Sequence, residues 1–272
     1  MTMTIPALGT VLCPVDLSEH SQAALYLAAG LSMAAESRLV ILRVDDRSDS
    51  ETDVMSARVE LEEFMRQTLP GSAGYRAATE TIISHGRPAE VILAHAAGRE
   101  AGLIVMGTRG RGALGRALLG STTERVLRET SVPLAMVPPS HPEVISLAET
   151  RAVPHVGIVL VPVDLAMPAS RQLEWAGRFS VASEHHLLMM HVVPNGTDRD
   201  TARERLDALA RTTPTARGIR TLVLDGDVAD EVVKVAARDK AGMIVLGRSG
   251  QAPGKMAYEL VRRTSSVVVL VP

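Results

Sequence analysis

The sequence contains very few aromatic residues: one tryptophan, three tyrosines and two phenylalanines among 272 residues. None of them alternates with a run of basic residues, so stacking platforms for nucleic-acid bases are not expected. An excess of charge is lacking as well, because 29 basic residues face 31 acidic ones and the formal net charge is −2. A near-neutral chain lacks the long-range attraction that general nucleic-acid and membrane-surface binders use. Nucleic acid is therefore not an expected partner.

Cysteine and long apolar runs are also scarce. Cys13 is the single cysteine, which excludes an intramolecular disulfide and favours a reducing compartment. The eight histidines show no metal-binding spacing, so no protein metal site is expected. No stretch of 18 apolar residues occurs, and the first residues lack the basic start and apolar core of a secretion signal. The sequence therefore predicts a cytoplasmic protein without a membrane-spanning segment.

The chain repeats itself along its length. The segment VLCPVDL at 11–17 recurs as VLVPVDL at 159–165, which places Asp16 opposite Asp164, 148 positions later. Further matches follow in the same order at separations of 148, 140 and 134 positions. One domain is therefore present twice, and the second copy is shortened in two places. The predicted parts are a first domain at 1–140, a linker at 141–154 and a second domain at 155–272.

Within each copy, short apolar runs alternate with helical patterns. In the first copy, strands are expected at 10–15, 39–44, 79–84, 103–106 and 133–137, with a helix at 19–35 after the first strand. Strands that are apolar throughout and separated by helices indicate a parallel sheet covered on both faces. The predicted fold class is therefore α/β, with two tandem doubly wound domains. Each has a five-stranded parallel sheet in the order 3-2-1-4-5.

A glycine-rich loop follows the fourth strand of the first copy. The 14 residues from Gly107 to Gly120 include five glycines, counting both ends, and a helix then begins with Ser-Thr-Thr. Glycine lets a ligand approach the backbone closely, and the free N–H groups of a helix start favour phosphate. In doubly wound sheets, ligands bind at the carboxyl ends of the strands where the strand order reverses. Asp16 and Val44 are expected at the same edge, so the first copy predicts a site for a phosphate-bearing ligand.

Two better-known phosphate motifs do not describe this loop. GRALLGS at 115–121 has the glycine spacing of a Walker A loop but no lysine. GRGALG at 110–115 matches G-x-G-x-x-G, but that fingerprint belongs after the first strand of a domain, with an acidic residue about 20 positions later. Neither requirement is met here.

The pattern Gly107-x2-Gly110-x9-Gly120-Ser121, after a strand ending in IVMG, resembles the universal stress protein family. PVDLSEHS, HGRPAEVI and TSVPLAMVP are similar to segments of that family, and the resemblance covers nearly the whole chain as two copies. It implies a flavodoxin-like fold and a regulatory or stress-response role without an enzymatic one. It also implies ATP as the bound adenine nucleotide, Mg²⁺ held through the phosphates, and dimers formed through the last strand.

The resemblance also assigns residues to the nucleotide. Asp16 would contact the adenosine, and the Val44 backbone would bond the adenine edge. Gly107 and Gly110 would line the ribose and phosphates, and Gly120 to Thr122 would hold the phosphates. The implied site consists of Pro14, Asp16, Val44, Met106, Gly107, Arg109, Gly110, Gly120, Ser121 and Thr122.

The second copy departs from this pattern. Gly247 and Gly250 are present, but only three residues separate Gly250 from Gly254-Lys255, and one of them is Pro253. So short and rigid a connection is a poor cradle for a triphosphate. Asp164 and Val192 are kept, however, so an adenosine fragment could still fit, and Lys255 could reach a phosphate. We expect a degenerate second domain that pairs with the first as an internal pseudo-dimer, through the strands at 133–137 and 266–271. Two chains are further expected to form a homodimer.

Alternatives remain open for single residues and for the whole chain. Asp16 is also a suitable cap for the helix that begins near Ser18, and Arg109 is equally well explained as a solvated surface arginine. A slow ATPase is a second function, although no committed general base is visible. A nucleotide-free interaction scaffold is a third. Nothing in the sequence identifies a regulatory protein partner.

Overall fold

The computed structural model of the protein describes residues 8–45, 51–69, 79–109, 119–139, 145–147, 152–154, 156–183, 185–193, 199–215, 218–248 and 255–272. The chain divides into two compact units. The first unit has its described residues within 8–139 and 145–154, and the second unit has them within 156–272.

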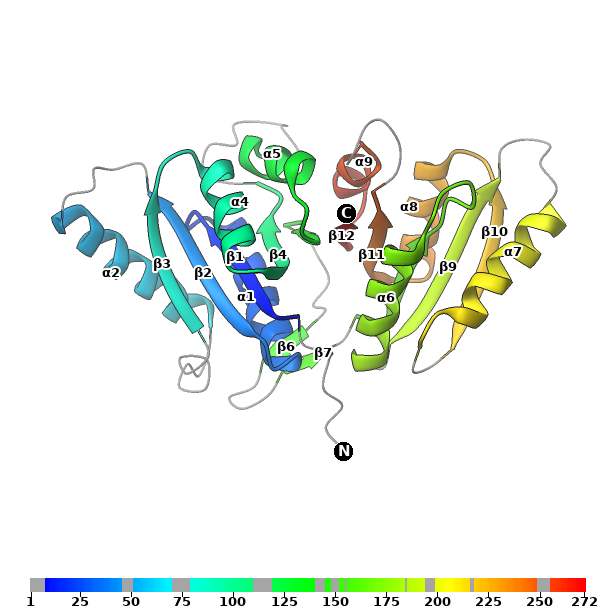
Figure 1. Ribbon diagram of the computed structural model, residues 1–272, viewed down its shortest axis with the longest axis horizontal. Coiled ribbons are helices and arrows are strands. Elements are labelled where there is room, and N and C mark those ends of the chain that lie inside the picture. The colour runs from blue at the N-terminus through cyan, green and yellow to red at the C-terminus, as the bar shows by residue number, and fades with distance from the viewer. Residues whose placement is uncertain are drawn as a thin grey trace. The chain divides into compact units, whose positions relative to one another are not determined.

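In the first unit, strands and helices alternate along the chain (Figure 1). They are β1 (Thr10–Val15), α1 (Glu19–Ala34), β2 (Arg38–Asp45), α2 (Glu51–Thr68), β3 (Thr79–His85), α4 (Pro88–Gly98), β4 (Ala101–Gly107), α5 (Ser121–Glu129) and β5 (Leu134–Val137). Parallel pairing joins β3 to β2, β2 to β1, β1 to β4 and β4 to β5. The order 3-2-1-4-5 is thereby confirmed.

The second unit repeats this arrangement. Its elements are β8 (Ile158–Pro162), α6 (Ser170–Ser183), β9 (His186–Val193), α7 (Arg199–Thr212), β10 (Ile219–Asp225), α8 (Val228–Arg238), β11 (Ala241–Gly247), α9 (Lys255–Arg263) and β12 (Val267–Val271). Parallel pairing joins β10 to β9, β9 to β8, β8 to β11 and β11 to β12. Both copies therefore have a flavodoxin-like doubly wound sheet, as predicted.

The sequence signals that place these elements are local. The central strands are apolar at nearly every position and buried on both faces, as in β4 and β11. Ser18 caps α1 by accepting a hydrogen bond from the Ser21 N–H, and Asp227 caps α8 in the same way through the Asp230 N–H. Pro88 stands in the first turn of α4, where its missing N–H leaves no helix bond unmade.

In both sheets, the first strand parts from the fourth before either strand ends. β1 pairs with β4 at Thr10, Val11 and Leu12, although β1 continues to Val15 and β4 to Gly107. β8 likewise pairs with β11 only as far as Leu160. A proline follows two positions later in each strand, Pro14 in β1 and Pro162 in β8, and proline has no N–H for a ladder bond. A crevice therefore opens at the carboxyl edge, where the strand order reverses.

The segment predicted as a linker, 141–154, contains two short strands. β6 (Ile145–Leu147) and β7 (Ala152–Pro154) form an antiparallel hairpin that contacts α1 of the first unit. The Leu147 N–H donates to the Tyr26 hydroxyl over 3.0 Å, and the Ile145 side chain is 2 % exposed. These residues belong to the compact body of the first unit.

Within the described residues, no helix is long and apolar enough to cross a membrane.

Candidate functional site

The first unit brings the expected ligand residues to one edge of its sheet. Pro14 lies near the end of β1, Val44 near the end of β2, and Met106 with Gly107 at the end of β4. β1 lies between β2 and β4, so these residues occupy the carboxyl ends of three adjacent strands. Of the implied residues, Gly110 lies outside the described part of the chain.

Asp16 organises the turn between β1 and α1. Its Oδ1 accepts hydrogen bonds from the Ser18 N–H over 3.1 Å and from the Ser18 hydroxyl over 2.6 Å. Ser18 is itself the cap of α1, so Asp16 holds the capping residue in place. The alternative that Asp16 itself caps α1 is therefore wrong, because Ser18 is the cap, while the contact of Asp16 with adenosine stays a prediction.

The start of α5 is held against the end of β4. The Gly120 N–H donates to the Thr108 carbonyl oxygen over 2.8 Å, and the Thr123 hydroxyl donates to the Gly107 carbonyl oxygen over 3.0 Å. Thr108 is 1 % exposed, so this junction is part of the core. Gly120 is the N-cap and has no side chain to satisfy the first N–H groups of the helix. The positive end of the α5 dipole is thus fixed beside Gly107.

Gly107 itself must be small. A Cβ at this position would lie 2.6 Å from the His20 carbonyl oxygen, because β4 closely approaches the first turn of α1. The glycine therefore lets the two turns, after β1 and after β4, come together.

Three polar groups surround this helix start. Ser121 is exposed and Thr122 half-buried, and neither side chain makes a hydrogen bond within the described residues. The Arg109 Nε is buried, and no described residue accepts a hydrogen bond from it. A buried guanidinium donor without a described acceptor, one residue after the Thr108 carbonyl that holds the helix start, fits an anionic group.

A buried ion-pair network stands at the end of β2, which sequence reasoning missed. Arg43 is 6 % exposed and lies 3.2 Å from Asp45 and 2.8 Å from Glu60 of α2. Its Nη1 also donates to the Ala57 carbonyl oxygen over 3.0 Å. The network ties α2 to the strand that carries Val44. An arginine within the apolar run LVILRV was the available signal.

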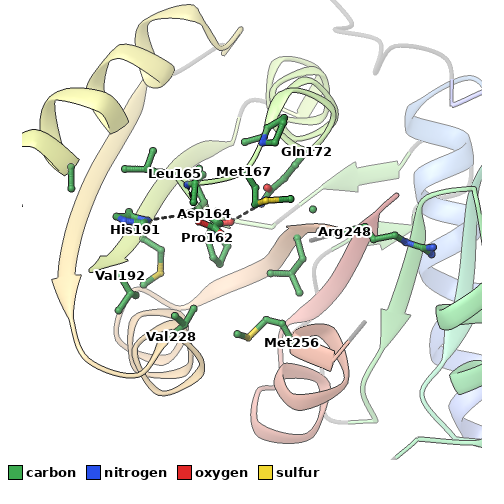
Figure 2. Close-up of a pocket in the computed structure, with 18 of the residues that line it drawn as sticks. Pro162, Asp164, Leu165, Met167, Gln172, His191, Val192, Val228, Arg248 and Met256 are labelled. Carbon is green, nitrogen blue, oxygen red and sulfur yellow. Dashed lines mark hydrogen bonds between the residues drawn. The ribbon is translucent and has the colours of Figure 1, made fainter. Parts of the chain in front are cut away.

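The second unit has a cavity of about 670 Å³ at the matching edge of its sheet. Its lining comes from the ends of β8, β9 and β11, the turn after β8, and all four helices (Figure 2). Asp164 is again a turn residue, because its Oδ1 accepts from the Ala166 N–H over 2.9 Å. His191 Nδ1 donates to the Val163 carbonyl oxygen over 2.8 Å. The shortened second copy has therefore kept a hollow that its degenerate loop did not suggest.

Gln172 lies at the base of this second crevice, where the two strands separate. Its Nε2 donates to the carbonyl oxygens of Pro162 in β8 and Val245 in β11, each over 2.8 Å. One side-chain amide thus bridges the two strands after their ladder ends. The first copy has Ala24 at the equivalent position, 148 residues earlier. That difference between the copies was the signal for Gln172, and sequence reasoning passed over it.

No group of three or more histidine, cysteine, aspartate or glutamate side chains that could hold a metal ion occurs within the residues the structure describes. Burial raises the pKa of the Cys13 thiol far above its ordinary value, which makes this side chain a neutral core residue.

The model of the universal stress protein family matches residues 8–138 of the chain. A universal stress protein of Thermus aquaticus, from the QAH/OAS sulfhydrylase 3′ region, is 32 % identical over 134 residues, which cover 47 % of this chain and 97 % of that relative. One of Synechocystis sp. is 29 % identical over 133 residues, covering 47 % and 85 %. The crystal structure of a universal stress protein from Archaeoglobus fulgidus is 23 % identical, covers 98 % of this chain and 97 % of its own, and has a TM-score of 0.71. This last similarity extends the shared fold over both units.

Proposed function

Because the chain belongs to the universal stress protein family, we propose that its first unit binds ATP with Mg²⁺ and that the bound nucleotide regulates a protein partner. The observation that carries the proposal is the junction of β4 and α5. There, a glycine-capped helix start is pinned to Thr108 and Gly107, and the next residue, Arg109, has a buried Nε that bonds no described residue. We place the protein in the cytoplasm and propose no enzymatic step for it.

The phosphates belong at this junction on chemical grounds. The first N–H groups of α5, the hydroxyls of Ser121 and Thr122, and the Arg109 guanidinium are all donors, and the helix dipole adds positive potential. The Gly110 backbone completes the proposed set. Mg²⁺ would be held by phosphate oxygens, because it keeps several waters and rarely needs a cage of protein ligands. It would neutralise phosphate charge.

The nucleoside belongs between β1, β2 and β4. Pro14, Met106 and Gly107 would line the adenosine, and the Val44 backbone would bond the adenine edge. Asp16, whose Oδ1 accepts from Ser18, would contact the adenosine. The proposal also includes an internal pseudo-dimer of the two units and a homodimer of chains.

The first test is the nucleotide content of freshly purified protein, denatured and analysed by chromatography and mass spectrometry. We expect about one ATP per chain, and Mg-ATP at 100 times its dissociation constant should stabilise the fold by about 2.7 kcal/mol. About two per chain would show that the second unit also binds ATP. No nucleotide and no thermal shift would favour the scaffold.

The second test locates the site by calorimetry. Gly120→Val puts a branched side chain at the helix cap, so ATP affinity should fall at least about tenfold. Gly254→Val, the counterpart substitution in the second copy, should leave the affinity unchanged. Unaltered binding in Gly120→Val, with the far-UV circular dichroism spectrum preserved, would contradict the assignment of the phosphates to α5.

A further inference from the structure

The cavity of the second unit has the size of a small-molecule site. Its volume of about 670 Å³ falls within the range of roughly 300–1,000 Å³ found for ligand pockets. Figure 2 shows Met167, Val228 and Met256 around it, from the turn after β8, from α8 and from α9. We call these three side chains the apolar rim.

The apolar rim leaves hydrophobic surface in water. Met167 is 45 % exposed and Val228 is 41 % exposed, and they are two of the four large hydrophobic side chains exposed among the described residues. Single exposed apolar residues need no explanation, but two at the mouth of one concave pocket indicate a surface that a ligand covers.

The polar groups of the lining are largely engaged within the protein. The Gln172 amide donates hydrogen bonds to two carbonyl oxygens at the base of the crevice. Arg205 donates to the Leu165 carbonyl oxygen over 2.6 Å, and His191 donates through Nδ1 to a backbone carbonyl. In the neutral imidazole this leaves Nε2 as an acceptor. Apart from His191 Nε2, the exposed Asp164 carboxylate and the two arginines, the described lining offers a ligand little hydrogen-bonding capacity.

Four positions at this pocket change from polar to apolar between the copies, whereas Gln172 at the base of the crevice replaces Ala24. Ser18, Glu19 and His20 of the first copy correspond to Ala166, Met167 and Pro168 in the second, and Thr122 corresponds to Met256. Each change replaces a polar side chain by an apolar one, and all four replacements line the cavity.

Among the described residues, the lining also lacks counterparts of the hydroxyls that would hold a phosphate in the first copy. Lys255 stands where the first copy has Ser121, but it is exposed and does not line the cavity. Arg248 does line it, yet in Figure 2 its side chain extends away from Asp164 and His191. A triphosphate would therefore meet methionine where the first copy offers hydroxyls.

We propose that this pocket binds an uncharged, largely apolar small molecule and does not bind a nucleotide. The tandem chain then has two ligand sites of different chemistry, one in each unit. This assignment does not depend on ATP binding by the first unit, because it concerns different residues and a different ligand.

Nile red, an uncharged dye whose emission shifts to the blue in apolar surroundings, is a suitable probe for the full-length protein. We expect saturable binding of one dye per chain. Met167→Glu and Met256→Thr restore the polar residues of the first copy, and each should weaken Nile red binding about tenfold through lost apolar contact. Met55→Glu is the matched control, because Met55 is 59 % exposed on α2 of the first unit, and it should leave binding unchanged.

Excess Mg-ATP should not displace the dye. Methyl resonances of ¹³C-labelled methionine provide an independent readout, since those of Met167 and Met256 should shift with Nile red and stay in place with Mg-ATP. Absence of saturable binding would overturn the proposal. So would equal affinity in both rim variants, or saturable shifts of these two resonances with Mg-ATP.

Discussion

Gly30 permits the hairpin β6–β7 to lie against helix α1, and an alanine there should reveal the contact. A Cβ built at Gly30 would lie 2.6 Å from Ile145 Cδ1, 2.8 Å from Cγ1 and 2.9 Å from Cγ2. Glycine within a helix is less favourable than alanine by about 1 kcal/mol, so Gly30→Ala would stabilise an uncovered helix. Overpacking against a buried β-branched side chain costs about 1–3 kcal/mol. The net expectation is a loss of about 1 kcal/mol.

The sign should reverse when Ile145 is shortened. Ile145→Ala removes all three atoms that the new methyl would meet, so Gly30→Ala in that background should stabilise the protein by about 1 kcal/mol. The coupling energy between the two substitutions is then about 2 kcal/mol, well above the value for independent sites. Urea unfolding of the full chain, followed by far-UV circular dichroism, measures all four members of the cycle.

Gly98→Ala is the matched control, because Gly98 is also helical and its added Cβ would meet nothing within 4 Å. It should stabilise the protein by up to about 1 kcal/mol regardless of Ile145. If Gly30→Ala stabilises the protein as Gly98→Ala does while Ile145 is intact, the hairpin does not cover α1 and the reasoning fails.

Two further predictions concern buried polar groups. Gln172→Glu replaces the bridging amide by a carboxylate that faces two carbonyl oxygens, and it should destabilise the protein by roughly 2–4 kcal/mol in urea unfolding; an unchanged midpoint would show that the bridge is dispensable. Cys13 should resist iodoacetamide until the protein unfolds. Because burial raises its pKa above the ordinary value of 9.0, the unfolded thiol ionises first as the pH rises. Between pH 9 and 10, the wild type should lose about 1 kcal/mol more stability than Cys13→Ala, and equal losses would contradict the burial of a neutral thiol.

The strands and their order were predictable because short apolar runs mark each strand, and because the same runs recur in both copies. Runs such as LVILRV and LLMMHV are apolar at nearly every position, which reports burial on both faces of a sheet. The agreement of two copies separates this pattern from chance. Loop glycines and the helix start at Ser121 are equally local, so the start of α5 was predictable, while the ligand site beside it stays a prediction.

The features that sequence reasoning missed depend on long-range contacts. Gln172 bonds Val245, 73 residues away, and no period or spacing encodes such a bridge. The hairpin at 145–154 has no counterpart in the repeat, so its contact with α1 left no pattern to read. The second cavity was missed for a related reason, because the shortened loop drew attention to lost phosphate ligands while the hollow depends on where two strands stop pairing.

The early parting of the first and fourth strands has a consequence for how such tandem chains diverge. The recess belongs to the backbone of the sheet, since the ladder ends at Leu12 in one unit and at Leu160 in the other. A duplicated domain therefore inherits the recess whatever happens to its loops, and a few rim substitutions can retune its selectivity while the strands that fold the unit stay intact. One copy can keep an ancestral ligand while its twin acquires a new one.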